Sequence, residues 1–238
     1  MKDQYFGDVN DYLKYGLLRC CLKADFQIGV CWMLTPSDHR GDGDKVSYLQ
    51  DPESWRSYDP QLFDLLNESA RGNVREVGRL EHSRLLGDAT FFSEFLTDNG
   101  LERNLYFARA LRRLATADLW FFDPDAGLEV TSVPYGRSGS SRYLYLKEIA
   151  EAWQTGASLV VFQHFTREKR DGLVARRAEE LRSYTRASSV VPIRSANVVF
   201  FAVCQSVHRQ QVDRALELIQ EHWGGRLHID PSFLQVTT

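Results

Sequence analysis

The sequence predicts an α/β fold, a single doubly wound domain whose sheet is mostly parallel and ends in a C-terminal antiparallel hairpin. Three compact apolar runs, at residues 27–34, 119–122 and 158–162, have the length and bulk of strands buried on both faces. Helical patterns alternate with these runs, which is typical of βαβ units and a parallel sheet. Two further β runs, at 190–193 and 198–203, are joined by residues 194–197 alone. So short a link permits a hairpin but not a parallel crossover.

The helices complete this Rossmann-like arrangement. The first, over residues 10–24, has an apolar stripe at helical spacing, and Asp8 or Asn10 can cap its N-terminus. The stretch 70–86 mixes charged and apolar residues and remains ambiguous. The other predicted helices lie at 60–68, 89–96, 101–115, 142–153, 169–184 and 207–223. Because no repeat or long linker divides the chain, we expect residues 1–238 to form one Rossmann-like domain.

Composition narrows the class of protein. With 238 residues, 43% of them hydrophobic, the chain can build one substantial core. It has no apolar run of about eighteen residues, and its first residues carry charge rather than an apolar signal core, so we expect a cytoplasmic protein without membrane association. The net charge of −3 argues against a generally basic nucleic-acid surface. The four cysteines lack paired metal spacing and are interpreted as structural thiols.

The most informative segment is the acidic end of the run at 119–122. Two carboxylates, Asp123 and Asp125, follow this run and are separated by Pro124, which cannot continue a strand. In open α/β sheets, ligands bind outside the carboxyl ends of the strands. The two acids are therefore candidates for binding or catalysis, although a turn-capping Asp123 beside a solvated Asp125 would give the same pattern.

Three segments resemble the family of RlmJ-type methyltransferases, which methylate N6 of adenine in large-subunit ribosomal RNA. The first is Gly-Asp-Val-Asn-Asp-Tyr-Leu-Lys-Tyr at 7–15, the second is His-Arg-Gly-Asp-Gly at 39–43, and the third is Asp123-Pro124, which is similar to the start of the family's Asp-Pro-Pro-Tyr motif. The resemblance implies a class I fold, S-adenosylmethionine as cofactor, and a nucleic acid or nucleotide as substrate. It also implies that Asp123 accepts a hydrogen bond from the target amine, and that the cofactor is bound by Lys14, His39, Gly41, Gly43, Gly87 and Asp88.

The sequence departs from the family pattern at three positions. Asp125 replaces the second proline, Ala126 replaces the aromatic residue that would stack on the base, and Tyr15 stands where the family has histidine. Tyr135 is a candidate for the missing aromatic residue. The amine-methylating signature is thus incomplete, and other functions stay open.

Two alternatives use the same residues. In the first, Asp123 and Asp125 bind a divalent metal and hydrolyse a phosphate ester, with His164, Glu129 and His39 as further candidate ligands. The loop at 134–142 could then wrap a phosphate, because it combines glycines, hydroxyls, Arg137 and Arg142, and Arg167 could extend the anion-binding surface. A mobile surface loop would have the same composition. In the second alternative, the chain is a nucleotide-binding module without catalysis.

Overall fold

A seven-stranded sheet organises the chain. The structure, a computed structural model, describes residues 1–38 and 45–230. Within this part, the strand order is β2-β1-β3-β6-β8-β7-β9, and β2, β1, β3, β6 and β7 run in one direction, while β8 and β9 run in the other. The predicted α/β class and the C-terminal hairpin are confirmed. The strands of the sheet are β1 (Ile28–Cys31), β2 (Thr90–Phe92), β3 (Leu119–Phe122), β6 (Ser158–His164), β7 (Ser189–Arg194), β8 (Val198–Cys204) and β9 (His228–Ile229).

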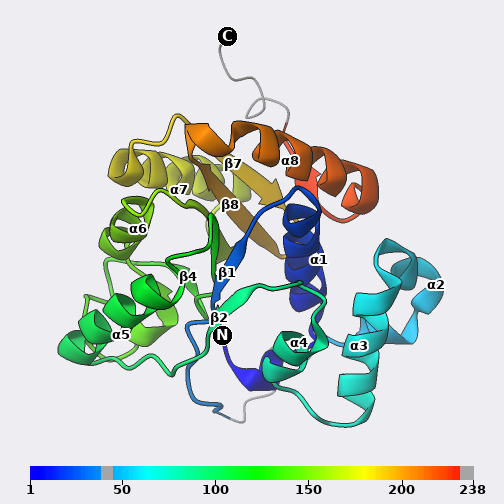
Figure 1. Cartoon of the computed structure of the whole chain (residues 1–238). Coiled ribbons are helices and arrows are strands. Elements are labelled where there is room, and N and C mark those ends of the chain that lie inside the picture. The colour runs from blue at the N-terminus through cyan, green and yellow to red at the C-terminus, as the bar shows by residue number, and fades with distance from the viewer. Residues whose placement is uncertain (39–44, 231–238) are drawn as a thin grey trace.

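Helices cover both faces of the sheet (Figure 1). Two of them, α1 (Val9–Lys23) and α8 (Arg209–Trp223), pack together on one face, and α5 (Gly100–Arg113), α6 (Leu146–Trp153) and α7 (Arg170–Thr185) pack on the other. Three further helices, α2 (Pro52–Trp55), α3 (Pro60–Arg71) and α4 (Gly78–Ser83), follow β1, and α3 contacts α1. A separate two-stranded ribbon joins β4 (Gly127–Leu128) to β5 (Tyr143–Leu144).

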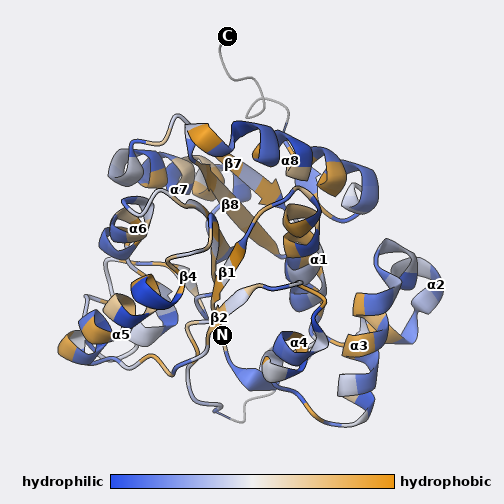
Figure 2. Ribbon diagram, viewed as in Figure 1, coloured by the Kyte–Doolittle hydropathy of each residue, from blue (hydrophilic) through white to orange (hydrophobic). Residues whose placement is uncertain are grey.

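Two apolar layers hold these helices to the sheet. In β3, Leu119 and Phe121 face the layer under α1 and α8, whereas Trp120 and Phe122 face the layer under α5 to α7. This alternation explains why the run is apolar at every position, since both faces of a central strand are covered. Figure 2 shows the same arrangement, with hydrophobic strands inside and hydrophilic outer surfaces on the helices.

Close packing of α1 against α8 depends on Gly16. The ring of Trp223, the last residue of α8, lies so close to Gly16 that a Cβ atom at this position would overlap it. Trp223 is 2% exposed, so its ring is a core element and not a surface contact. The glycine therefore sets how near α8 approaches the helix that carries Lys14.

One predicted helix is wrong. Residues 89–96 contain the strand β2, which pairs in parallel with β1 through Thr90, Phe91 and Phe92. The aromatic residues in this stretch fit a helical spacing, but β-branched and aromatic residues also favour strands, and the open edge of β1 decides between them. The other predicted helices are present, with ends shifted by a few residues, and the ambiguous stretch 70–86 contains α4.

The strand order reverses between β1 and β3. From β1 the chain turns to β2 on one side, while β3 and β6 lie on the other side. In such sheets, ligands bind where the strand order reverses, outside the carboxyl ends of the strands. No helix among the described residues is long and apolar enough to cross a membrane.

Candidate functional site

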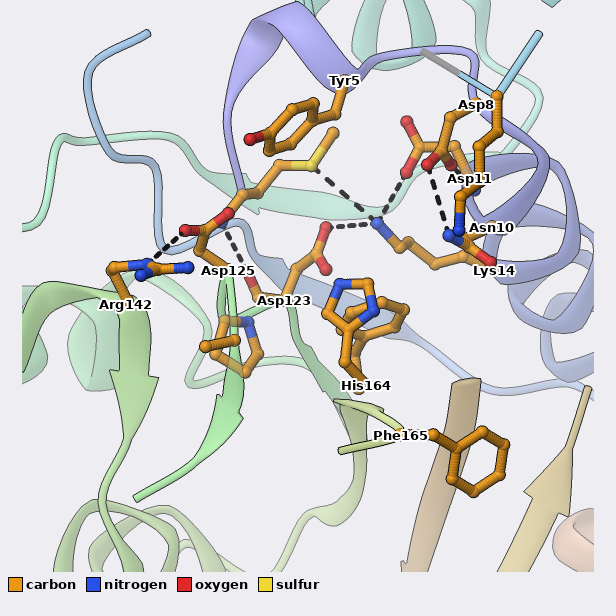
Figure 3. A pocket seen from close by; sticks show the side chains of 15 residues that line it. Tyr5, Asp8, Asn10, Asp11, Lys14, Asp123, Asp125, Arg142, His164 and Phe165 are labelled. Atoms are coloured by element: carbon orange, nitrogen blue, oxygen red, sulfur yellow. Dashed lines mark hydrogen bonds and ion pairs between the residues drawn. The ribbon is translucent and has the colours of Figure 1, made fainter. Parts of the chain in front are cut away.

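A cavity of about 420 Å³ lies at the carboxyl ends of β3 and β6 (Figure 3). Asp123 follows β3 directly, and its side chain faces this cavity while being only 1% exposed. Its amide donates to the carbonyl of Cys31, the last residue of β1, at 3.1 Å. The last residue of β1 therefore holds the backbone of Asp123 at the end of β3. Pro124 ends β3 at this point.

Lys14 from α1 reaches the same point. Its Nζ atom lies 2.6 Å from Oδ2 of Asp123 and 2.7 Å from Oδ1 of Asp11, and all three side chains are buried. The helix begins at Val9 because the carboxylate of Asp8 caps it by accepting from the Asp11 amide at 2.9 Å. Positions 11 and 14 then share one helix face, which places one carboxylate on each side of the ammonium group (Figure 3).

The charges in this cluster shift each other's pKa. Burial by itself would lower the pKa of Lys14, but the carboxylates of Asp11 and Asp123 raise it above the ordinary lysine value. Burial raises the pKa of Asp11, against the opposing effect of Lys14. Burial, together with the charge of Asp11, raises the pKa of Asp8 to about 7. The single ammonium group of Lys14 cannot neutralise all the carboxyl groups around it, so a cationic ligand is electrostatically favoured here.

Two buried polar atoms in this region have no hydrogen-bond partner. Asn10 donates through Nδ2 to Asp8 at 3.2 Å, but its Oδ1 atom is unpaired, and Asn10 lines the cavity. The hydroxyl of Tyr15 is also unpaired and fully buried. An unsatisfied buried acceptor is costly, so the free oxygen of Asn10 marks a place for a ligand donor.

Asp125 points away from this cluster. Its Oδ2 atom lies 2.8 Å from Nε of Arg142, whose side chain is 54% exposed at the rim of the cavity. The two predicted acids therefore face different cations, Lys14 and Arg142, as Figure 3 shows. Within residues 1–38 and 45–230, no three His, Cys, Asp or Glu side chains are arranged to hold a metal ion. The metal hypothesis gains no support from this arrangement.

His164 ends β6 and lines the cavity beside Lys14. Burial lowers its pKa to about 4, and the charge of Lys14 acts in the same direction. The imidazole is therefore neutral near pH 7. A neutral ring between an ammonium group and the cavity can donate or accept one hydrogen bond without adding charge.

Met1 lies between the segments that follow β1 and β3. The α-amino nitrogen of Met1 donates to the carbonyl oxygens of Asp123 at 3.0 Å and Met33 at 3.2 Å. The amide of Thr35 donates back to the Met1 carbonyl at 2.9 Å. The backbone of Met1 thus ties the segment after β1 to the segment after β3 and forms one wall of the cavity.

The other residues predicted to bind the cofactor fall into two groups, one outside the described residues and one away from this cavity. His39, Gly41 and Gly43 lie outside the described residues. Gly87 and Asp88 precede β2, and because β2 runs parallel to β1, they lie at the opposite edge of the sheet from Asp123. Lys14 is the one residue of that predicted set that the described part of the chain places at the site.

The loop at 134–142 binds an anion that the chain itself supplies. The amides of Gly139 and Ser141 donate to the carboxylate of Asp98 at 2.8 and 2.7 Å. Burial would raise the pKa of Asp98, but these amides hold it below its ordinary value. The predicted phosphate loop is therefore occupied by a side chain from the segment before α5.

The predicted substrate residues divide accordingly. Arg142 lines the cavity of Asp123, whereas Tyr135 lines a different cavity beside α7. Glu129, predicted as a metal ligand, lines that second cavity and not the one of Asp123. Arg137 and Arg167 are exposed and line neither of these two cavities. Three aromatic residues that were not predicted, Phe165, Phe162 and Tyr5, line the cavity of Asp123. Phe165 follows His164 directly, so the end of the same strand was the signal for it.

No protein-family model matches this sequence, and no curated protein sequence matches it significantly.

Proposed function

We propose that this protein is an S-adenosylmethionine-dependent methyltransferase that acts on a nucleic acid or a nucleotide. The observation that carries the proposal is the position of Asp123. A buried carboxylate stands at the carboxyl end of a central strand, beside the point of strand reversal, and faces a cavity of about 420 Å³. The resemblance of residues 7–15 to the methyltransferase motif also supports it. Lys14 from this segment contacts Asp123, and Asp11 from the same segment contacts Lys14.

The cavity fits the proposed cofactor in charge and size. S-adenosylmethionine carries a sulfonium cation and an amino-acid end with an ammonium and a carboxylate group. The free Oδ1 of Asn10 and the acids Asp8 and Asp11 suit the cationic groups. The volume lies within the range of about 300–1,000 Å³ that is common for small-molecule sites.

The residues of the chain would position the target. When bound, the cofactor supplies an electrophilic methyl group. Asp123 uses Oδ2 for Lys14, and its Oδ1 has no hydrogen-bond partner among the described residues, so Oδ1 can accept an N–H of a substrate amine and orient the nitrogen lone pair. Lys14 holds the carboxylate in place, and Phe165 offers a ring for stacking at the cavity wall.

Calorimetric titration with S-adenosylmethionine and S-adenosylhomocysteine tests the proposal. We expect heat of binding and a higher melting temperature, since a ligand at 100 times its Kd stabilises the native state by about 2.7 kcal/mol. The variant Asp123→Asn should still bind the cofactor but lose transfer of a labelled methyl group to oligonucleotides and nucleosides by about 100-fold or more. Asp213→Asn, an exposed change on α8, is the matched control and should behave as wild type.

Two results would count against the proposal in different ways. If millimolar S-adenosylmethionine produced neither heat of binding nor a higher melting temperature, the protein would not use this cofactor. Cofactor binding without methyl transfer to any of these acceptors, equally in wild type and Asp123→Asn, would favour the non-catalytic nucleotide-binding module.

A further inference from the structure

A second cavity, of about 550 Å³, adjoins the site along the same edge of the sheet. The segment after β1 forms one wall, with Lys45 and Trp55, and the turn between β7 and β8 forms another, with Asn197. Arg226 and His228, which follow α8, complete it. Because β7 runs in the same direction as β6 and β3, the turn after β7 lies at the carboxyl edge, where Asp123 lies.

Lys45 joins the two cavities. It is among the lining residues of both, and the amide of Phe165, from the first cavity, donates to the carbonyl of Asn197, from the second, at 3.4 Å. The side chain of Lys45 is exposed, and no carboxylate of the described residues pairs with it. An unpaired ammonium at the junction of two cavities is suited to an anion that spans them.

The second cavity combines an aromatic ring with an available cation. The guanidinium carbon of Arg226 lies 3.8 Å from the ring centroid of half-buried Trp55. The Nε atom of Arg226 is buried and unpaired. The guanidinium group also lies 5.6 Å from the ring centroid of Tyr58 and donates one long hydrogen bond, through Nη2, to the carbonyl of Ser54 at 3.4 Å. By contrast, Arg142 and Arg194, at the same edge, each pair with a carboxylate.

The acidic groups around the second cavity do not neutralise this cation. Asp51 is the one carboxylate among the described lining residues, and it accepts from the Ser54 amide at 3.3 Å as the N-cap of α2. A flat ring, a guanidinium group and an ammonium group together match a nucleotide, whose base can stack and whose phosphate is anionic.

From these contacts we infer that a single-stranded polynucleotide binds across both cavities, with one nucleotide at Asp123, a backbone phosphate at Lys45 and a neighbouring base at Trp55 and Arg226. This inference rests on the proposed function and narrows its substrate from free nucleotides to strands. A mononucleotide fills one cavity only, so it cannot use Lys45 and Trp55 together with Asp123.

Fluorescence anisotropy with labelled RNA and DNA oligonucleotides of roughly eight nucleotides tests the inference. We expect an oligonucleotide to bind at least tenfold more tightly than a mononucleotide. Lys45→Ala should reduce the slope of log affinity against log salt by about 0.7, the value for one single-strand phosphate contact. Lys23→Ala, at the exposed end of α1 on the opposite edge, should leave this slope unchanged.

Tryptophan fluorescence tests the stacking contact separately. Oligonucleotide binding should quench the wild type and Trp153→Phe, and this quenching should be lost in Trp55→Phe; both tryptophans are half-buried, but Trp153 ends α6 away from the cavities. Because phenylalanine keeps an aromatic ring at these core borders, both variants should fold.

Three results would overturn the inference. The first is equal affinity for a mononucleotide and an oligonucleotide, and the second is an unchanged salt slope in Lys45→Ala. The third is that polyglutamate competes as well as an unlabelled oligonucleotide, which would indicate binding by charge alone. If the cofactor binds while these results hold, the strand inference fails and the proposed function stands. If strands bind through Lys45 and Trp55 but the cofactor does not bind, the methyltransferase proposal fails and the strand-binding surface stands.

Discussion

Two buried ion clusters of this protein differ in how completely they are satisfied. Arg103 from α5 is fully buried and donates to both carboxylate oxygens of Glu148, at 2.6 and 2.9 Å, and to the carbonyls of Ser140 and Tyr143. Lys14 is equally buried but faces Asp11 and Asp123 at once, beside an unpaired Asn10 and an open cavity.

The difference separates structural from functional ionic groups. The Arg103 cluster has one cation, one anion and an acceptor for each guanidinium nitrogen, and the rings of Tyr145, Phe107 and Tyr135 surround its guanidinium group. Such a cluster fixes the packing of α5 against α6 and offers nothing to a ligand. The Lys14 cluster has excess acid and a free acceptor, which a ligand can satisfy.

The largest expected effect is loss of stability in Arg103→Met. Removing the guanidinium group leaves the Glu148 carboxylate buried without a cation, and breaking a buried pair in this way costs about 3–5 kcal/mol. Lys14→Met should cost about half as much, because water in the adjoining cavity can solvate Asp11 and Asp123. Urea unfolding at neutral pH measures both. An equal loss in the two variants would show that Lys14 is a structural group like Arg103.

A second prediction uses the pH dependence of stability. Because the folded state raises the pKa of Asp8 to about 7, the folded form binds a proton that the unfolded form, with an ordinary aspartate pKa, has released. The contribution of Asp8 to stability should therefore fall as pH rises from about 4 to about 7, by about 1.4 kcal/mol per unit of pKa difference. Asp8→Asn keeps a good N-cap and should abolish this loss. Asp51→Asn, an exposed cap on α2, is the matched control.

His164 acts in the opposite direction. Its folded pKa of about 4 lies below the ordinary value of 6.5, so its contribution to stability is present above pH 6.5 and is lost as pH falls toward 4. His164→Gln should remove this acid-side loss. Thermal unfolding at a series of pH values separates the two contributions, and identical pH profiles in wild type and both variants would contradict the assignment.

The smallest expected effect belongs to the rim pair of Asp125 and Arg142. The Arg142 side chain is 54% exposed, and such pairs contribute about 0–1 kcal/mol. Asp125→Asn should therefore change the free energy of unfolding by less than about 1 kcal/mol. A loss comparable to that of Lys14→Met would place Asp125 in the buried cluster after all.

Local signals in the sequence predicted most of the fold. The apolar run of β3 and the proline after Asp123 determine the local backbone, so the strand and the residue at which it ends can be predicted from the sequence. The strand β2 was mistaken for a helix because its identity depends on pairing with β1, about sixty residues earlier in the chain, and on no local pattern.

The same distinction applies to the site. Asp123 and His164 were predicted together because parallel strands end at one edge, and the structure places both at the cavity, with Lys14 and Arg142. The partner of the 134–142 loop was missed because Asp98 lies 41 residues before Gly139. Composition predicts that such a loop binds an anion, but it cannot tell an external phosphate from a carboxylate of the chain.

Gly16 affects the geometry of both cavities, because it sets how closely α1 and α8 pack. Lys14 precedes it by half a turn of the same helix, and the amide of Arg226 is bonded to the carbonyl of Trp223, the residue whose ring rests on the glycine. Any enlargement of residue 16 would push the two helices apart and displace the ammonium group of one cavity together with the guanidinium group of the other. Natural variation at this position is therefore expected to be narrow, because no substitution can retune one binding region without disturbing its neighbour.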